Sequence, residues 1–351
     1  MVAPLDWGLG HVTRCIPIIR ALIYNGFEVV LAAENAQANL LKNEFPLLLL
    51  LPLKGYRVTY SKYKWWLPVA LFLQLPRVLV LIRQENRWLN GIIAEHGIDL
   101  VISDNRFGLY SGKIPCIFIT HQLTIKAPFV WVQNLIRKIN YSFINRFTSC
   151  WVPDAIGKNN LAGLLSHPTH LPKTKLHYIG LLSRFVEVSA ENKYDFCILL
   201  SGPEPQRTLL EEKILTGLAL VPGKILLVRG MPGNTESLSV PKNTTVQNHL
   251  SGNLLQEAIL QSSYIISRSG YTTLMEILSL YKKSILIPTP GQTEQEYLAK
   301  KLQKQNACLV FTQAELNCAT HFKRAKDFQF QLPEFAIFKE ETIIDLLKKS
   351  I

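Results

Sequence analysis

The chain has 351 residues, which is enough for two domains that each bury a core of their own. Apolar residues make up 48% of the sequence, and this content excludes an intrinsically disordered protein. The formal net charge of +12 suits phosphorylated ligands or an anionic lipid surface as partners. Because no RNA-recognition or helix-turn-helix signature accompanies this charge, we expect no nucleic acid partner.

Short apolar strands alternate with helical stretches in the first half, a pattern typical of a parallel sheet with crossover helices. A helix is expected at 12–24, where Asn25-Gly26 ends it. The expected strands lie at 2–5, 28–32, 47–51, 100–103, 116–119 and 149–152. These elements predict a Rossmann-like N-terminal domain over residues 1–165.

Within this half, Trp65–Ile82 is an apolar run nearly as long as a membrane span. It contains two prolines, a glutamine and Arg77, and an arginine near the bilayer centre costs about 2.5–3.5 kcal/mol, so we expect no spanning helix. Two alternatives stay open. The run is either a helix buried against the sheet or part of a surface, Lys54–Arg87, that lies on an anionic membrane. The second alternative predicts a cytoplasmic protein held peripherally on the inner face of the cell membrane.

The same alternation of strands and helices resumes after a connection predicted at 166–193. Strands are expected at 196–200, 224–228, 244–247, 264–266, 284–287 and 308–310, with helices at 207–218, 254–261, 273–280 and 294–305. They predict a second Rossmann-like domain over 194–351, whose final helix at 340–349 is able to return to the first domain. The predicted fold is therefore α/β, with two parallel-sheet domains that face each other across a cleft.

Cysteines and histidines give no sign of a metal site. The six cysteines are scattered without a C-x-x-C pair and lie mostly in apolar surroundings, which indicates reduced thiols in a cytoplasmic protein. His167 and His170 lie three residues apart without a cysteine or carboxylate nearby. We expect neither a metal ion nor a cofactor.

A glycine-rich loop follows the first strand and leads from Gly8 through Gly10 to His11. It lacks the third glycine of a dinucleotide fingerprint, which disfavours NAD. Histidine is well suited to take a proton from a hydroxyl near neutral pH, so His11 is the candidate catalytic base. Asp104 follows another strand and is expected beside His11, where it would hold the tautomer of the ring. His121 is a second candidate, expected near the molecule whose hydroxyl gives up the proton.

A second strand-glycine-helix turn lies at 267–273. Backbone amides at the start of a helix bind phosphate, and Gly270 permits a close approach. Glu276 is placed to accept the two hydroxyls of a ribose, or it only favours the helix dipole. Further along, Gln292, Glu294 and Gln295 are suited to sugar hydroxyls, although an ordinary helix N-terminus has the same composition.

Together these segments resemble the inverting GT-B glycosyltransferases, close to the MurG-type N-acetylglucosaminyltransferases of glycosyltransferase family 28. The resemblance spans nearly the whole chain, and it is most specific from Ser267 to Glu276. Ser201-Gly202-Pro203 departs from the glycine loop that is usual in the family. The resemblance assigns donor contacts to Gly10, Ser201, Gly202, Arg268, Ser269, Gly270, Tyr271, Thr272, Glu276, Gln292, Glu294 and Gln295.

The resemblance implies that a hexose or N-acetylhexosamine moves from a UDP-sugar donor to a hydroxyl acceptor, without a metal ion. Helix dipole and loop amides would stabilise the departing UDP. The acceptor is left open between lipid-linked and other cell-envelope molecules. Two further alternatives are a UDP-sugar 2-epimerase on the same two-domain plan and a non-catalytic subunit that binds a nucleotide sugar.

Overall fold

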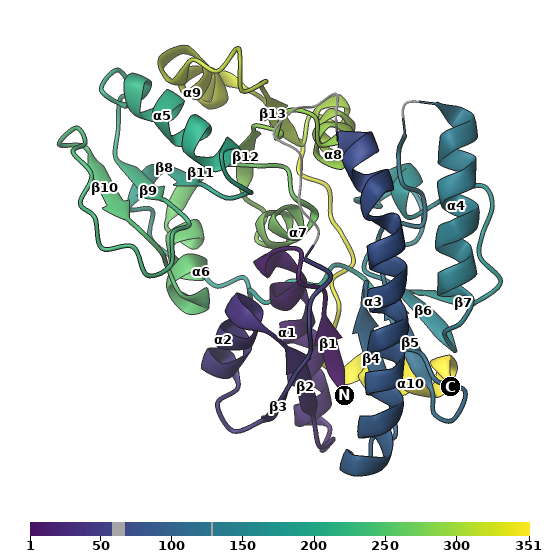
Figure 1. Ribbon diagram of the computed structural model, residues 1–351. Helices are drawn as coiled ribbons and strands as arrows, with labels where there is room; N and C mark the ends of the chain where they lie inside the picture. Colours follow the sequence, from purple (N-terminus) through teal and green to yellow (C-terminus); the bar gives the residue numbers. More distant parts are fainter. Residues whose placement is uncertain (58–66, 128) are drawn as a thin grey trace. The chain divides into compact units, whose positions relative to one another are not determined.

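The computed structural model describes residues 1–57, 67–127 and 129–351, and of residues 67–75 it describes only the backbone. The chain forms two compact units (Figure 1). The first unit comprises Met1–Arg184 together with Ala336–Ile351, and the second comprises Phe185–Phe335. Each unit holds one sheet whose strand pairs are all parallel.

The sheet of the first unit has the strand order β3-β2-β1-β4-β5-β6-β7. Its strands are β1 (Val2–Pro4), β2 (Val30–Ala33), β3 (Leu49–Pro52), β4 (Val101–Asp104), β5 (Cys116–Ile119), β6 (Ser149–Val152) and β7 (Lys175–Tyr178). The order reverses between β1 and β4, so their following loops leave toward opposite sides. Such a switch point is where open α/β sheets bind ligands.

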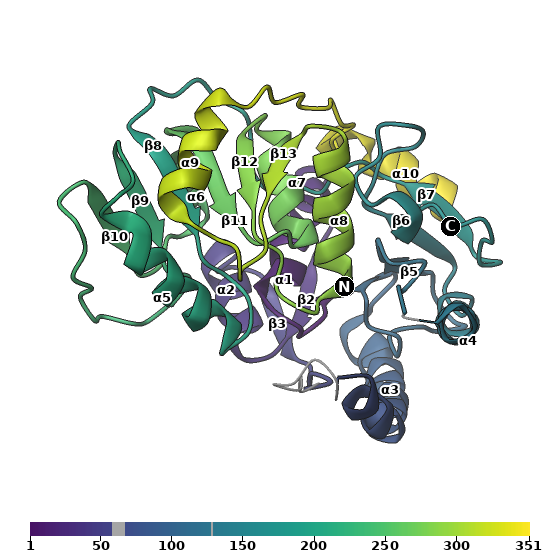
Figure 2. The ribbon, with the colours of Figure 1, turned by 90° about the horizontal axis from the view of Figure 1, so that it is seen from above.

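The helices of the first unit are α1 (Leu9–Tyr24), α2 (Asn35–Glu44), α3 (Leu67–His96), α4 (Val130–Ile144) and α10 (Ile343–Ser350), with 3-10 turns at Gly163–Leu165 and Glu340–Thr342. Helices α3 and α4 run side by side in both views (Figures 1 and 2). Leu89 of α3 and Ile144 of α4 share one buried apolar cluster with Phe118 of β5. This cluster is the core on one face of the sheet.

The sheet of the second unit has the order β10-β9-β8-β11-β12-β13 and reverses between β8 and β11. Its strands are β8 (Tyr194–Leu199), β9 (Ile225–Val228), β10 (Thr244–Gln247), β11 (Ser262–Ser267), β12 (Lys283–Leu286) and β13 (Cys308–Val310). Its helices are α5 (Gln206–Leu218), α6 (Gly252–Leu260), α7 (Tyr271–Ser279), α8 (Thr293–Lys304) and α9 (Cys318–Asp327). Successive residues of β8 point to opposite faces, so Phe196 and Ile198 pack with α5 and α9, while Cys197 and Leu199 pack with α6 and α7.

The bounds of the two units differ from those of the predicted domains at both ends of the second domain. Strand β7 lies inside the predicted connection at 166–193, and it extends the first sheet by pairing with β6. Its partly exposed residues give no apolar run, which is why the sequence did not indicate a strand there. At the end of the chain, α10 belongs to the first unit, where Trp151 Nε1 donates a hydrogen bond to Ser350 Oγ over 2.8 Å.

No helix within the described ranges is long and apolar enough to cross a membrane. The run Trp65–Ile82, which left two alternatives open, lies partly outside the described residues. Of its residues with described side chains, Ile82 is buried, whereas Leu79 and Val80 are exposed. This part of α3 therefore contributes one side to the core and leaves apolar side chains at the surface.

Candidate active site

His11 is positioned by the turn between β1 and α1. Gly8 precedes the helix with a φ of 104°, a backbone conformation that side-chain-bearing residues rarely adopt. Helix α1 begins directly after it, which places His11 in the first helical turn beyond the end of β1. Since β1 pairs with β4, the last residue of β4, Asp104, lies at the same edge of the sheet.

His11 and Asp104 are in direct contact, as the sequence predicted. His11 Nδ1 lies 2.7 Å from Asp104 Oδ2, and the side chain of His11 is 17% exposed while that of Asp104 is completely buried. Arg14 also binds this carboxylate, because its Nε donates to Oδ1 over 2.9 Å and its Nη2 over 2.5 Å. The carboxylate fixes the ring by Nδ1 and leaves Nε2 as the nitrogen that can take up a proton.

The surroundings of His11, above all its burial, favour its neutral form. Burial and the neighbouring Arg14 guanidinium lower the pKa of His11 below its usual value, and Asp104 only partly offsets them. Burial alone would raise the pKa of Asp104, but the charges of Arg14 and His11 outweigh it and hold that pKa below its usual value. At neutral pH the pair is therefore a neutral imidazole beside an ionised carboxylate, the state required of a general base.

Arg14 is the residue of this cluster that sequence reasoning missed. Its side chain is 2% exposed, and Nη1 lies 3.3 Å from His121 Nδ1, so it joins the two histidines that were predicted separately. A signal was present in the sequence. Arg14 stands three residues after His11, on the same helical face, and directly before the apolar run from Cys15 to Ile19.

The second predicted loop lies at the start of α7, in the second unit. Gly270 occupies the N-cap position, and Ser269 before it is fully buried, with Oγ donating to the carbonyl of Gln295 over 2.8 Å. Tyr271 and Glu276 are buried as well, whereas Gly270 and Thr272 are half-buried. The hydroxyl of Ser269 therefore holds the loop against α8, and the backbone amides at the start of α7 are the groups suited to an anion.

Arg268 was predicted to contact the donor, but its side chain is only 1% exposed. Its Nη1 donates to the carbonyl of Ile287 over 3.1 Å, and its Nη2 donates to the carbonyl of Gln206 over 2.8 Å and to Gln313 Oε1 over 2.6 Å. Burial lowers the pKa of Arg268 to about 10, which leaves the guanidinium charged at neutral pH. The side chain lies behind the loop and joins three neighbouring segments.

The glutamines after β12 bond to each other and to their own loop. Gln295 Oε1 accepts from the amide of Thr289 over 2.9 Å, and its Nε2 donates to Gln292 Oε1 over 2.5 Å. Gln292 and Glu294 are both half-buried, whereas Gln295 is buried. Gln295 therefore shapes this loop, and Gln292 and Glu294 are more accessible.

The predicted contacts after β8, Ser201 and Gly202, are exposed. The helix that follows them, α5, already has a carboxylate at its N-terminus. Glu204 Oε2 accepts from the amide of Thr208 over 3.2 Å, and Oε1 accepts from Arg207 Nε over 2.6 Å. An anion at this helix would meet a negative charge, so the start of α7 is the better phosphate site of the two.

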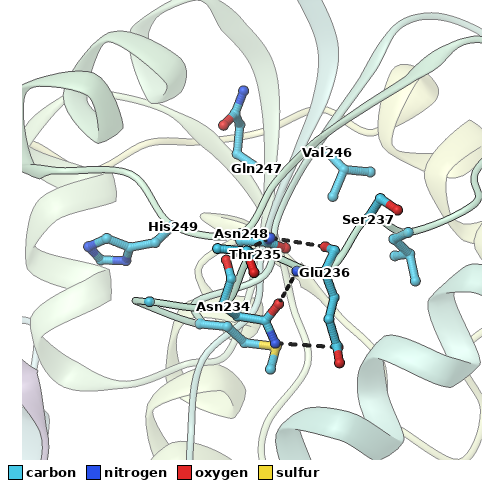
Figure 3. A pocket seen from close by; sticks show the side chains of 11 residues that line it. Asn234, Thr235, Glu236, Ser237, Val246, Gln247, Asn248 and His249 are labelled. Carbon is cyan, nitrogen blue, oxygen red and sulfur yellow. Dashed lines mark hydrogen bonds between the residues drawn. The ribbon is translucent and has the colours of Figure 1, made fainter.

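A cavity of about 460 Å³, which the sequence did not predict, lies in the loops after β9 and β10 (Figure 3). Asn248 Nδ2 closes these loops by donating to the carbonyls of Asn234 over 2.9 Å and Glu236 over 3.1 Å. Asn248 Oδ1 in turn accepts from Arg229. In the described part of the chain, no group of three or more histidine, cysteine, aspartate or glutamate side chains is placed to hold a metal ion.

Solved structures identify the class of this fold. The glycosyltransferase SnogD from Streptomyces nogalater superposes with a TM-score of 0.64 and 14% identity, covering 100% of this chain and 98% of that chain. MurG from Acinetobacter baumannii superposes with a TM-score of 0.57 and 14% identity, covering 99% and 98%. The predicted fold is confirmed: two Rossmann-like parallel-sheet domains of the GT-B type.

Sequence comparison assigns a family to part of the second unit. Residues 240–327 match the glycosyltransferase family 28 C-terminal domain. A transferase from Caldicellulosiruptor saccharolyticus, named for moving N-acetylglucosamine from its UDP form to a pyrophosphoryl-undecaprenol acceptor, is 35% identical over 82 residues, 23% of this chain and only 22% of that relative. A transferase of the same name from Clostridium botulinum is 23% identical over 90% of this chain and 86% of its own length. The chain therefore has the predicted GT-B fold, and residues 240–327 carry the match to a family 28 C-terminal domain.

Proposed function

We propose that this protein transfers a hexose or N-acetylhexosamine from a UDP-sugar to a hydroxyl acceptor, with inversion and without a metal ion. The observation that carries the proposal is the hydrogen bond of His11 with buried Asp104 at the switch point of the first sheet. The family 28 domain in the second unit supports the donor class, since named relatives use a UDP-sugar. In this proposal the second unit binds the donor and the first supplies the base.

The roles follow from the chemistry of the residues. His11 Nε2 removes the proton of the acceptor hydroxyl while the hydroxyl oxygen attacks the anomeric carbon of the sugar. The bond from that carbon to the UDP oxygen breaks on the opposite face, which inverts the centre. Backbone amides at the start of α7 stabilise the diphosphate that leaves. Glu276 accepts the ribose hydroxyls, and Gln292 with Glu294 binds the sugar.

Donor binding is tested by calorimetric melting with UDP and a panel of UDP-sugars. A ligand that binds only the folded protein adds about 2.7 kcal/mol at 100 times its dissociation constant. We expect wild type to be stabilised by UDP and the Glu276→Gln variant to lose most of that ligand-induced gain, because an amide accepts ribose hydroxyls poorly. Glu257→Gln, at an exposed position of α6, is the matched control and should respond like wild type.

The reaction itself is tested by release of UDP from the UDP-sugar that stabilises the protein most. Release that requires an added acceptor supports the transferase. Isomerisation of the sugar without an acceptor would instead establish the epimerase, and nucleotide binding without either reaction would leave a non-catalytic subunit. A full UDP response of Glu276→Gln would remove the ribose contact from the proposal.

We further propose that the acceptor is lipid-linked and that the first unit rests on the inner face of the cell membrane. Helix α4 supports this, because Trp131, Leu135 and Ile139 recur every four residues and are 69%, 52% and 45% exposed. Exposed Lys138 adjoins this stripe. On α3, which shares an apolar cluster with α4, Leu79 and Val80 are exposed near three exposed arginines, Arg77, Arg83 and Arg87. Apolar stripes beside basic residues suit an anionic lipid interface.

Sedimentation with phosphatidylglycerol vesicles tests this surface. Replacing Trp131 and Leu135 together by glutamine should weaken vesicle binding about tenfold or more, since each large apolar side chain that leaves water contributes about 1.5–3 kcal/mol. The control replaces Leu220 and Leu254, exposed leucines of the second unit, by glutamine and should bind like wild type. Equal binding by both double variants would place the lipid contact elsewhere.

A further inference from the structure

Arg14 lies at the centre of the His11–Asp104 cluster and contacts both His11 and His121. Its guanidinium donates to Asp104 Oδ1 and lies 2.7 Å from His11 Nδ1 through Nη2 and 3.3 Å from His121 Nδ1 through Nη1. An arginine side chain only donates hydrogen bonds, and an ionised carboxylate only accepts them. These two facts restrict where each imidazole carries its proton.

His11 Nδ1 has two neighbours at 2.7 Å, the oxygen of Asp104 and Nη2 of Arg14, and it cannot bond to both. The contact with the carboxylate is a hydrogen bond only when Nδ1 carries the proton. Without that proton, an anionic oxygen would face a nitrogen lone pair. Arg14 Nη2 already has Asp104 Oδ1 as an acceptor, so it does not require Nδ1. The neutral ring of His11 is therefore protonated on Nδ1.

The opposite holds for His121. Its Nδ1 faces Arg14 Nη1, which has no acceptor in this cluster other than that nitrogen, so Nδ1 must accept. A neutral imidazole whose Nδ1 accepts carries its proton on Nε2. The same arginine thus sits between two rings with opposite proton positions, and all four side chains come from the first unit.

We propose that Arg14 is a positioning residue that holds His11 and His121 in opposite tautomers, so that His11 Nε2 accepts a proton and His121 Nε2 donates a hydrogen bond. This rests on the proposed function, in which His11 is the base. His121 then serves the acceptor molecule as a neutral donor to an oxygen and does not exchange a proton during the reaction. One buried guanidinium divides the two roles between side chains of the same type.

The tautomers are measured directly from the ring nitrogen signals of the full chain labelled with ¹⁵N-histidine. His11→Gln and His121→Gln identify which signals belong to each ring. We expect a protonated Nδ1 in His11 and a protonated Nε2 in His121. In Arg14→Met the signals of His121 should shift because its Nδ1 loses a donor. Arg20→Met is the control, since Arg20 lies on α1, pairs with Glu44 and should leave both rings unchanged.

Activity gives a second readout through glutamine, whose amide donates a hydrogen bond but does not act as a base. His121→Leu should lose about tenfold in the rate of UDP release, the value of one hydrogen bond, and His121→Gln, which restores a donor, should recover part of that loss. His11→Gln should be as inactive as His11→Ala. Equal losses in the two glutamine variants, the same tautomer in both rings, or unchanged His121 signals in Arg14→Met would overturn the proposal. A wild type that releases no UDP with any acceptor would refute the proposed function, while the nitrogen signals would still decide the tautomers.

Discussion

Replacement of His11 by alanine is expected to lower the turnover number by about 10²–10⁴-fold, the usual contribution of a general base, while the affinity for UDP stays near that of wild type. The two effects separate because His11 lies in the first unit and the proposed donor residues lie in the second. Turnover is followed as UDP release at saturating donor, and affinity by the melting shift with UDP.

The pH dependence of the same reaction checks the assignment. The pKa of His11 is lowered, so its active neutral form persists below the ordinary histidine value of 6.5, and the acidic limb of kcat/KM should fall below pH 6.5. The free energy of unfolding also falls as the pH falls. Between the two pKa values the unfolded chain binds the proton and the folded chain does not, so this contribution is complete above pH 6.5 and is lost as the pH falls. Full turnover in His11→Ala, or a variant that is merely less stable, would show that His11 is not the base.

The largest loss of stability is expected from Glu85→Ala, at about 3–5 kcal/mol. Glu85 of α3 is almost completely buried, and its Oε1 accepts from Arg106 Nε over 2.5 Å. Its Oε2 accepts from Tyr56 Oη and from the amide of Gly108. Removing the carboxylate leaves a buried guanidinium without its counter-charge and two further donors without their acceptor, and the penalty for the unpaired charge is the larger part.

A double variant separates the contribution of the ion pair to stability from that of the surrounding packing. Glu85→Leu with Arg106→Met removes both charges, and it should cost clearly less than Glu85→Ala because no charge stays buried alone. Urea unfolding followed by tryptophan fluorescence measures the change, and all six tryptophans lie in residues 1–184, so the signal reports the first unit. A double variant as unstable as the single one would mean that packing, rather than charge, dominates here.

Much of the fold could be predicted from the sequence because most of its strands are buried. Strand β5 is apolar along its whole length and β6 is apolar after Ser149, because both faces of a parallel sheet are covered, and such runs are visible in a sequence. Strand β7 at the sheet edge and the polar helix α9 bury few residues, so no apolar pattern indicated them. The pairing of His11 with Asp104 could be predicted because adjacent parallel strands end at one edge.

What the sequence could not give was the direction of individual side chains. Arg268 and Ser269 stand in the most specific motif, yet both are buried and bond to neighbouring segments, Ile287 after β12 and Gln295 of α8. In the sequence Arg14 resembles an ordinary surface charge on a helix, yet it is buried in the cluster with His11 and Asp104. A motif predicts which loop carries a site. Whether a side chain of that loop points to the ligand or into the core depends on packing against segments distant in the chain.

The second unit is an insertion within the first, because residues 336–351 complete the first unit after the second has ended. Gly180 lies so close to the backbone of Ala336 and Ile337 that a Cβ there would come within 2.9 Å of it. During synthesis the ribosome releases these last residues after every strand of the second unit. The second unit is therefore able to finish folding first, and the first, although it holds the start of the chain, must wait for the end, which reverses the usual N-terminal-first order.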